Sequence, residues 1–197
     1  FFCSFSIALF VVILTLIGNP AICRGSNQFP VYPVIKNNVV FWERIYSHYS
    51  INSAVIHDRK DLSKVYGTIN LLDRKLPGAS KLNQAALKSI EKRYTKILTE
   101  LAGGKRASSK DEKRIAALFK GTNRKAQMAE AAENVRTQTG QKERFQEGVV
   151  RSGAYMTRLK KIFRSRGLPI ELAYLPHVES SFNSKAYSKF GAAGMWQ

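Results

Sequence analysis

Two prolines near the end of the chain, Pro169 and Pro176, place the strictest limits on how residues 167–197 can fold. Pro169 suits the first position of a helix, because its ring fixes φ at a helical value and no hydrogen bond needs its missing N–H there. Pro176 would lie inside that helix, where it removes a donor and clashes with the preceding turn. We therefore predict that the helix is kinked or split at Pro176 and that Glu179 lies just after the break, near a helix end.

Glu179 is the carboxylate in this segment that best fits acid catalysis. Within residues 151–197 the only other acidic side chain is Glu171, whereas basic residues are plentiful. The segment also contains a run of small residues at 191–194 and four aromatic side chains, Phe182, Tyr187, Phe190 and Trp196. A lone acid in a basic, glycine-rich and aromatic setting is typical of a groove that binds a sugar chain and protonates it.

Two effects are expected to raise the pKa of the Glu179 carboxyl. The negative end of the helix dipole disfavours ionisation near a helix C-terminus. Apolar neighbours, namely Leu175, Val178 and Phe182, would desolvate the carboxyl if they enclose it. Both effects favour the protonated state, which a general acid needs near neutral pH.

A mechanism with one carboxylate fits these residues better than one with two. Most glycosidases divide proton donation and stabilisation of the cationic centre between two carboxylates. Glu171 precedes Glu179 by eight residues, which in a helix would separate them by about 12 Å along the axis. That separation exceeds the one used in either of the two-carboxylate mechanisms.

The same segment resembles the opening signature of the soluble-lytic-transglycosylase (SLT) catalytic domain. The resemblance is carried by Glu179-Ser180, Phe182-Asn183, Ala186, Ser188 and residues 191–197. Upstream it includes Leu168-Pro169, residues 171–173 and Leu175-Pro176, and this version is most similar to the membrane-bound lytic murein transglycosylase D branch. The resemblance is strongest over residues 145–197, and a weaker one runs through Phe41-Trp42, residues 56–58 and Val65-Tyr66.

The resemblance implies a non-hydrolytic cleavage of peptidoglycan in which Glu179 is the catalytic residue. Glu179 would protonate the β-1,4 oxygen between MurNAc and GlcNAc, and the N-acetyl group of the substrate would support the cation. Glu179 would then take the proton from the MurNAc C6 hydroxyl, which closes a 1,6-anhydro ring. The resemblance also implies substrate-binding roles for Ser180, Ser188, Met195 and Gln197, with Ser180 orienting Glu179. No cofactor and no metal are expected.

Two other functions stay open on the sequence alone. A muramidase on the same fold would hydrolyse the bond, using a second carboxylate or a held water from beyond Gln197. A non-catalytic module could instead bind the cell wall or another polyanion through basic helices. Because the chain lacks an initiating Met and ends inside the motif, we expect an incomplete catalytic domain that is inactive by itself.

The charge of the chain predicts a polyanionic partner. Its net charge is +18, and residues 88–166 alone carry 21 basic and 8 acidic side chains, a net charge of +13. Such an excess fits an acidic wall polymer or anionic lipid, or else a set of solvated helix faces. Nucleic acid is not expected as the natural partner, because the chain is expected to be exported.

Residues 1–25 are expected to form a signal peptide or a retained N-terminal anchor. Residues 1–17 are uncharged and apolar, and small residues precede a candidate cleavage site before Arg24. Both cysteines, Cys3 and Cys23, lie in this segment, so no disulfide framework is expected. We expect the protein in the periplasm or cell envelope, with membrane association if the segment is retained.

A leader region is expected over residues 26–82. Residues 27–36 should form an extended linker, and residues 38–50 an amphipathic helix. The apolar stripe of that helix consists of Val39, Trp42, Ile45, Tyr46 and Tyr49. Residues 53–58 and 64–71 can pair as a β-hairpin. His57 and Asp58 are interpreted as a strand-end histidine beside a turn aspartate, because no Ser or Cys nucleophile motif accompanies them.

A basic helical region is expected over residues 83–144, before the catalytic domain begins at residue 145. Helices are predicted over residues 83–101 with Asn83 as the N-cap, from Ser108 or Ser109 to Gly121, over 123–136, and over 141–166. We also predict that these helices pack together as a small helical bundle. The fold class is therefore expected to be mainly α: a helical N-terminal region that can include a small β-hairpin, leading into an incomplete lysozyme-like α-rich domain.

Overall fold

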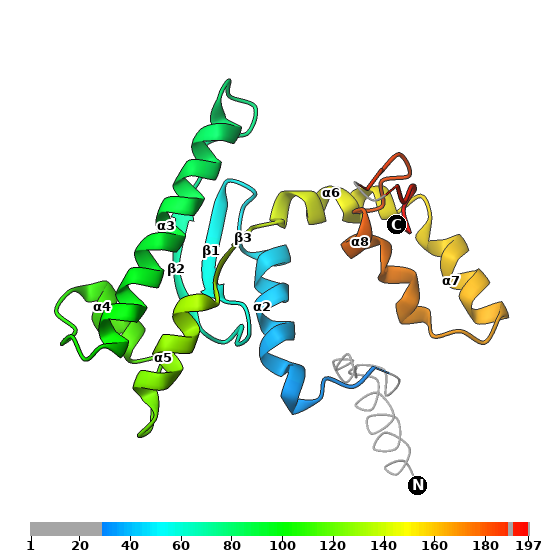
Figure 1. The fold of residues 1–197 in the computed structure, drawn as a ribbon. Coiled ribbons are helices and arrows are strands. Elements are labelled where there is room, and N and C mark those ends of the chain that lie inside the picture. Colours follow the sequence, from blue (N-terminus) through cyan, green and yellow to red (C-terminus); the bar gives the residue numbers. More distant parts are fainter. Residues whose placement is uncertain (1–28, 189–190, 197) are drawn as a thin grey trace, which may run out of the picture. The chain divides into compact units, whose positions relative to one another are not determined.

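The computed structural model describes residues 29–188 and 191–196 (Figure 1). The expected signal peptide or anchor at residues 1–25 therefore lies outside the described residues, as do Phe190 and Gln197. The described helices and strands all belong to the compact unit Pro33–Gln197. Their content is mainly α, with one small β-sheet, as the sequence predicts.

The first long helix of this unit is α2 (Lys36–Ser47), which follows the 3-10 turn η1 (Pro33–Ile35). The predicted helix is confirmed, but it begins earlier than expected, because the residues from Pro33 onward are already helical rather than extended. Phe41 and Ile45 form its buried side. They pack against Val55 of the sheet.

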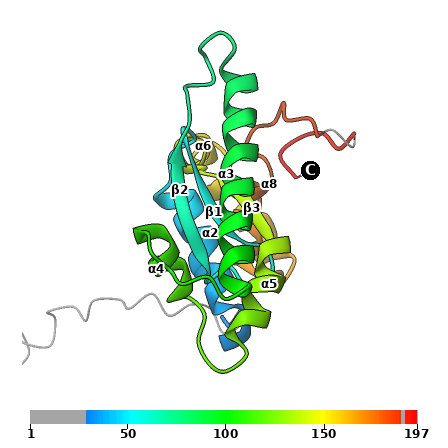
Figure 2. The same ribbon diagram turned by 60° about the vertical axis from the view of Figure 1, so that its left-hand side comes forward.

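Three antiparallel strands form a sheet in the order β2-β1-β3 (Figure 2). The predicted hairpin is confirmed as β1 (Ser53–Asp58) and β2 (Val65–Asn70). The third strand, β3 (Val135–Thr139), was not predicted, and the helix expected over residues 123–136 ends at Glu133 instead. Its sequence alternates β-branched and polar residues, which favours a strand, although the segment is too short to stand out.

Successive residues of β1 point to opposite faces of the sheet and so divide the interior into two cores. Val55 belongs to the cluster under α2, and Ile56 belongs to a larger cluster under the helices on the other face. The sheet is therefore covered by helices on both faces (Figures 1 and 2). This arrangement corrects the expected helical bundle, because β3 pairs with β1 and draws the basic helices onto the sheet.

The larger core is closed by α3 (Ala79–Ala102), α4 (Lys110–Ala116) and α5 (Arg124–Glu133). Helices α3 and α5 pack against each other, and α3 also contacts β1 and β3. The buried residues of this core are Ile56, Tyr66, Tyr94, Leu98, Leu101, Ile115, Phe119, Met128, Ala131, Ala132 and Val135.

The ends of α3 and α4 test the predicted caps. Ser109 caps α4 and forms a capping box with Glu112, as one of the two predicted serines. Asn83 is not the N-cap of α3, which begins after Gly78, at a left-handed φ of 75°. Asn83 instead lies buried inside the helix, where its amide bonds both the N–H and the carbonyl of Leu72 at 2.9 Å. The side chain therefore fixes the loop before the helix rather than the helix end.

His57 and Asp58 have structural roles, as interpreted from the sequence. The Asp58 carboxylate accepts hydrogen bonds from the N–H groups of Lys60 and Asp61 and from the hydroxyl of Tyr66. The His57 ring bonds the backbone carbonyl of Asp58 at 2.9 Å, not its carboxylate.

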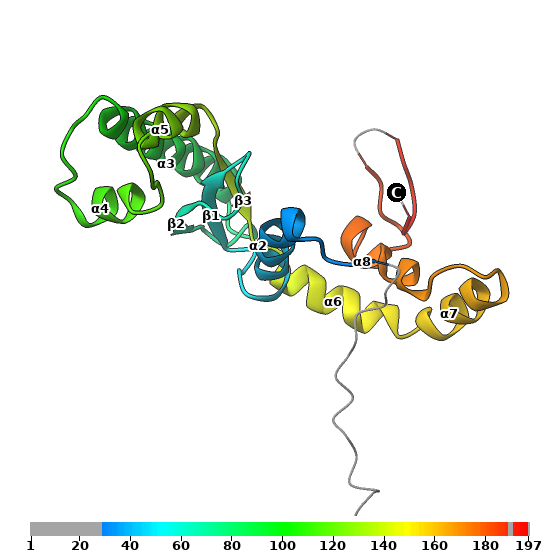
Figure 3. The same ribbon diagram turned by 90° about the horizontal axis from the view of Figure 1, so that it is seen from below.

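The C-terminal segment consists of α6 (Lys142–Ser152), α7 (Met156–Ser165), η2 (Ile170–Tyr174) and α8 (Pro176–Glu179) (Figure 3). The prediction of a single helix over residues 141–166 is wrong, because the helix is interrupted between Ser152 and Met156. There the Ser152 hydroxyl donates to the Val149 carbonyl at 2.7 Å, a local bond that competes with the helical pattern.

Helix α6 contacts both α2 and α8, and α7 packs on η2. The segment that carries Glu179 is therefore attached to the leader helix through α6. Over the described residues, 29–188 and 191–196, no helix is both long enough and apolar enough to cross a membrane.

Candidate active site

Glu179 is the last residue of α8, a single helical turn that begins at Pro176. The preceding 3-10 helix η2 ends at Tyr174, so the predicted break at Pro176 is confirmed. Pro169 immediately precedes η2 rather than occupying its first position. The break sets α8 apart as a short turn, at whose end Glu179 is exposed to solvent.

The two residues that follow Ser180 adopt a left-handed backbone conformation, with φ of 53° at Ser181 and 55° at Phe182. Each such non-glycine residue costs about 1–3 kcal/mol, which surrounding contacts must offset. Burial of the Phe182 ring is one such contact: it is 1% exposed and lies 4.5 Å from the ring of His177. The N–H of Phe182 also donates to the carbonyl of Pro176 at 3.0 Å.

Helix α6 supplies the other contacts to this strained loop. The Arg151 side chain donates from Nε to the Ser181 carbonyl at 2.8 Å. Gly148, one turn earlier on α6, packs so closely that a Cβ added there would lie 3.1 Å from both Cα and Cβ of Ser181. Arg151 and Gly148 thus hold the backbone just after Glu179 at a fixed place against α6. Neither residue is predicted from the sequence, because both lie on a helix outside the motif.

Residues 186–188 run antiparallel to residues 191–194, and these two short arms are called the hairpin. The N–H of Ser188 donates to the Ala192 carbonyl at 2.8 Å, and the Ser188 Oγ accepts from the Ala192 N–H at 3.0 Å. The N–H of Gly194 donates to the Ala186 carbonyl at 2.9 Å. Gly191 and Gly194 have φ of 89° and 91°, values that favour glycine.

The hairpin returns to α8 through Ser180, whose hydroxyl donates to the Met195 carbonyl at 2.9 Å. The structure thus joins two of the predicted site residues, Ser180 and Met195, and Ser180 directly follows Glu179. Ser188 lies in the hairpin, where its hydroxyl accepts from the Ala192 N–H. The Ser180 hydroxyl bonds this carbonyl, and its predicted orientation of Glu179 stays a prediction. Gln197, the fifth predicted site residue, lies outside the described residues.

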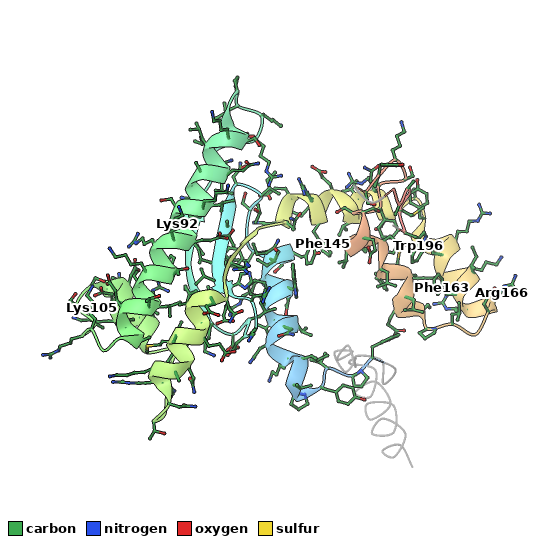
Figure 4. The ribbon with its side chains drawn as sticks, viewed as in Figure 1. Lys92, Lys105, Phe145, Phe163, Arg166 and Trp196 are labelled. Atoms are coloured by element: carbon green, nitrogen blue, oxygen red, sulfur yellow. The ribbon has the colours of Figure 1, made fainter. Side chains whose placement is uncertain are left out.

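Trp196 packs against Phe163 of α7. Its ring stacks on that of Phe163, with centroids 6.1 Å apart and an interplanar angle of 22° (Figure 4). This contact ties the end of the hairpin to a helix that buries none of its described residues.

A chain of aromatic rings connects α2, α6 and α8. Tyr46 lies 5.7 Å from Phe145, and Phe145 lies 5.3 Å from His177, measured between ring centroids (Figure 4 labels Phe145). Burial of the Tyr46 phenol raises its pKa above the ordinary value, and the negative charge of Glu179 raises it further. Tyr46 of the leader helix therefore lies within electrostatic range of Glu179, which the helical spacing alone could not reveal.

The apolar enclosure expected around Glu179 is not formed by the described residues. Leu175 and Val178 are themselves exposed, and only Phe182 is buried. Burial lowers the pKa of His177 below its ordinary value, so this imidazole is neutral at neutral pH. Its Nδ1 has no hydrogen-bond partner among the residues that the structure describes.

Comparison with protein families finds similarity to one family model, at the C-terminal end of the chain. Residues 159–197, which contain η2, α8, the hairpin and α7 except for its first three residues, match the family model described as "Transglycosylase SLT domain". The match covers 39 of the 197 residues, and Glu179 and Ser180 lie within it.

A curated relative matches a short stretch of the chain. It is described as "Putative tributyltin chloride resistance protein" from Alteromonas sp. (strain M-1) and is 45% identical over 47 residues. The matched stretch covers 24% of this chain and only 23% of the relative's length. No solved structure matches the chain.

Proposed function

We propose that this chain is part of a lytic transglycosylase in which Glu179 is the sole general acid and base. The observation that carries the proposal is the family match over residues 159–197, together with the exposed position of Glu179 at the end of α8. A side chain that protonates a polymer must be reachable from solvent. The strained loop that α6 holds directly after Glu179 limits the movement of this side chain.

In the proposed reaction, the Glu179 carboxyl gives its proton to the β-1,4 oxygen, and the bond from MurNAc C1 to that oxygen breaks. The Glu179 carboxylate then accepts the proton of the C6 hydroxyl, and a bond from O6 to C1 forms. The products are a GlcNAc hydroxyl and a 1,6-anhydro-MurNAc end. Atoms balance without water, and Glu179 returns to its protonated state.

The substrate contacts proposed for this reaction come from the loop and hairpin beside Glu179. Ser188 and Gln197 would bond the sugar near the cleaved link, and Ser180 and Met195 would support the same wall. The hydrogen bond from Ser180 to Met195 is consistent with this role, because it fixes the hairpin against α8. Among the described residues no group of three or more His, Cys, Asp or Glu could hold a metal ion.

Hydrolysis by a muramidase remains the second candidate, and one observation favours it. Glu43 of α2 and Val178 of α8 line one surface groove. Val178 is the residue before Glu179. A second carboxylate there could activate a water, which the sequence of the C-terminal segment alone does not provide.

We further propose that the protein belongs to the membrane-bound D branch of these enzymes and acts in the periplasm or cell envelope. The support is the pattern of residues 168–176 and the apolar N-terminal run. Membrane association would follow if that run is retained.

The test is mass spectrometry of the muropeptides that the full-length protein releases from purified peptidoglycan. Products one water lighter than hydrolysis products, without a reducible end, would support the proposal. Reducing ends that disappear in a Glu43→Gln variant would favour the muramidase. Absence of any product would overturn both and favour a wall-binding module.

A further inference from the structure

Helix α2 has a second apolar face besides the one that packs on the sheet. Ile35, Val39, Trp42 and Tyr46 follow one another at intervals of four, three and four residues, which places them along one side of the helix. Phe41 and Ile45 point into the core instead. The single apolar stripe predicted from the sequence combined residues that belong to these two faces.

This second face lines a groove of about 630 Å³, with Val178 of α8 on its other side. Trp42 is 41% exposed and Val178 is 56% exposed. Asn38 and Glu43 add polar groups to its lining. A groove of this size, mostly apolar with a few polar groups, has the character of a ligand site rather than of an ordinary surface.

The groove ends beside the proposed catalytic residue in the sequence, because its lining includes Val178. Val178 directly precedes Glu179 in α8. Tyr46 lines the groove, lies 6.1 Å from the Trp42 ring, and is affected by the charge of Glu179. A polymer bound in the groove would therefore lie near α8, the turn that carries the proposed catalytic carboxylate.

We infer that the α2 groove is a binding subsite for the peptidoglycan glycan strand, with Trp42 as the platform for one sugar ring and Asn38 and Glu43 as its polar contacts. The inference rests on the proposed function, since it takes the same polymer as substrate. Sugar rings have an apolar face and polar edges, which suits an amphipathic aromatic ring flanked by hydrogen-bonding groups. A polymeric substrate must also extend on both sides of the cleaved bond.

The charge of the groove favours a glycan over a membrane surface. Glu43 is its charged residue, and neither Lys nor Arg occurs among the described residues that line it. Surfaces that bind anionic lipids are instead rich in Lys and Arg. Contacts in this subsite would be made equally in the bound substrate and in the transition state, so their loss should raise KM, most of all for long strands.

The experiment compares Trp42→Ala and Trp42→Phe in the full-length protein. We expect Trp42→Ala to raise KM for purified glycan strands by about tenfold, which corresponds to about 1.4 kcal/mol. Trp42→Phe should restore most of the affinity because it keeps an aromatic face. Leu82→Ala is the matched control, since Leu82 is an exposed residue of α3 that does not line the groove. Thermal unfolding of each variant checks that the fold is intact.

A binding titration separates this inference from the proposed function. Glycan strands are titrated into the Glu179→Gln protein with and without Trp42→Ala. If the wild-type protein gives product but Trp42→Ala changes neither KM nor the titration, the groove inference is overturned and the function stands. If the wild type gives no product, the function fails, and the titration alone decides the groove. Loss of vesicle binding or of self-association in Trp42→Ala, with glycan binding unchanged, would assign the groove to a membrane or a second copy and overturn the inference.

Discussion

The sheet with helices α3 to α5 shares one continuous apolar core, whereas the segment from α6 onward is held by ring contacts and a few hydrogen bonds. The first region buries eleven residues in a single cluster. In the second, α7 buries none of its described residues, and α8 buries only Pro176 and His177. The difference indicates that the first region supplies stability, whereas the second supplies an exposed carboxylate whose position depends on α6.

The largest expected effect is on chemistry alone. Glu179→Gln should lower kcat of the full-length protein on peptidoglycan by about 10³-fold, because the amide can neither give nor take the proton. Because Glu179 is exposed, the melting temperature should stay unchanged. Turnover within tenfold of the wild type would remove Glu179 from the mechanism.

The next largest effect is a loss of stability in the first region, the sheet with α3 to α5. Leu98 is fully buried in the larger core, so Leu98→Ala should lower the free energy of unfolding by about 3 kcal/mol. For a domain of this size that corresponds to a fall of about 6–12 °C in melting temperature. Leu82→Ala, an exposed residue of the same helix, is the control. An equal shift in both variants, measured by circular dichroism, would contradict the assignment of stability to this core.

A smaller effect tests how the second region is held. Arg151→Gln removes the charged donor to the Ser181 carbonyl, so the strained loop beside Glu179 should loosen. We expect kcat to fall about tenfold, or about 1.4 kcal/mol in the barrier, with little change in KM. Arg151→Lys should recover part of the rate because it keeps a donor. A fall in melting temperature with kcat unchanged would make Arg151 a purely structural residue.

The smallest expected effect is the pH dependence of stability, to which each of the two regions contributes one histidine. Burial lowers the pKa of both His57, in the sheet, and His177, in α8. The unfolded chain therefore binds more protons than the native one, and stability should fall as pH drops below about 6.5. His177→Phe should reduce this acid sensitivity, as should His57→Phe. Urea unfolding at pH 7.5 and 5.5 measures it, and an unchanged pH dependence in both variants would refute this account.

Local signals in the sequence predicted much of the fold. The β-rich run at residues 53–58 predicted β1, Ser109 predicted a cap, and Pro176 predicted the break before Glu179. These features depend on covalent geometry and on neighbours a few residues away. Strand β3 depends instead on the edge of β1, which only the folded sheet provides, and the split between α6 and α7 depends on local hydrogen bonds of Ser152.

The same limit applies to the candidate site. Glu179, Ser180 and Met195 were predicted from the resemblance of one short segment to a family motif, and the structure adds the hydrogen bond from Ser180 to Met195. Tyr46, Arg151 and Gly148 reach the site from other helices, and nothing in the spacing of the motif indicates them. Exposure of Leu175 and Val178 could not be read from the sequence either, because apolar character predicts burial only when a partner surface covers it.

The position of β3 also sets the order in which the chain can complete its fold during synthesis. Strand β1 is central, but its second neighbour is made only after α3, α4 and α5. Until Thr139 has emerged, one edge of β1 is unpaired and open to pairing with another nascent chain. The groove on α2 rests on this sheet through Phe41 and Ile45, so it acquires its support only at that late stage.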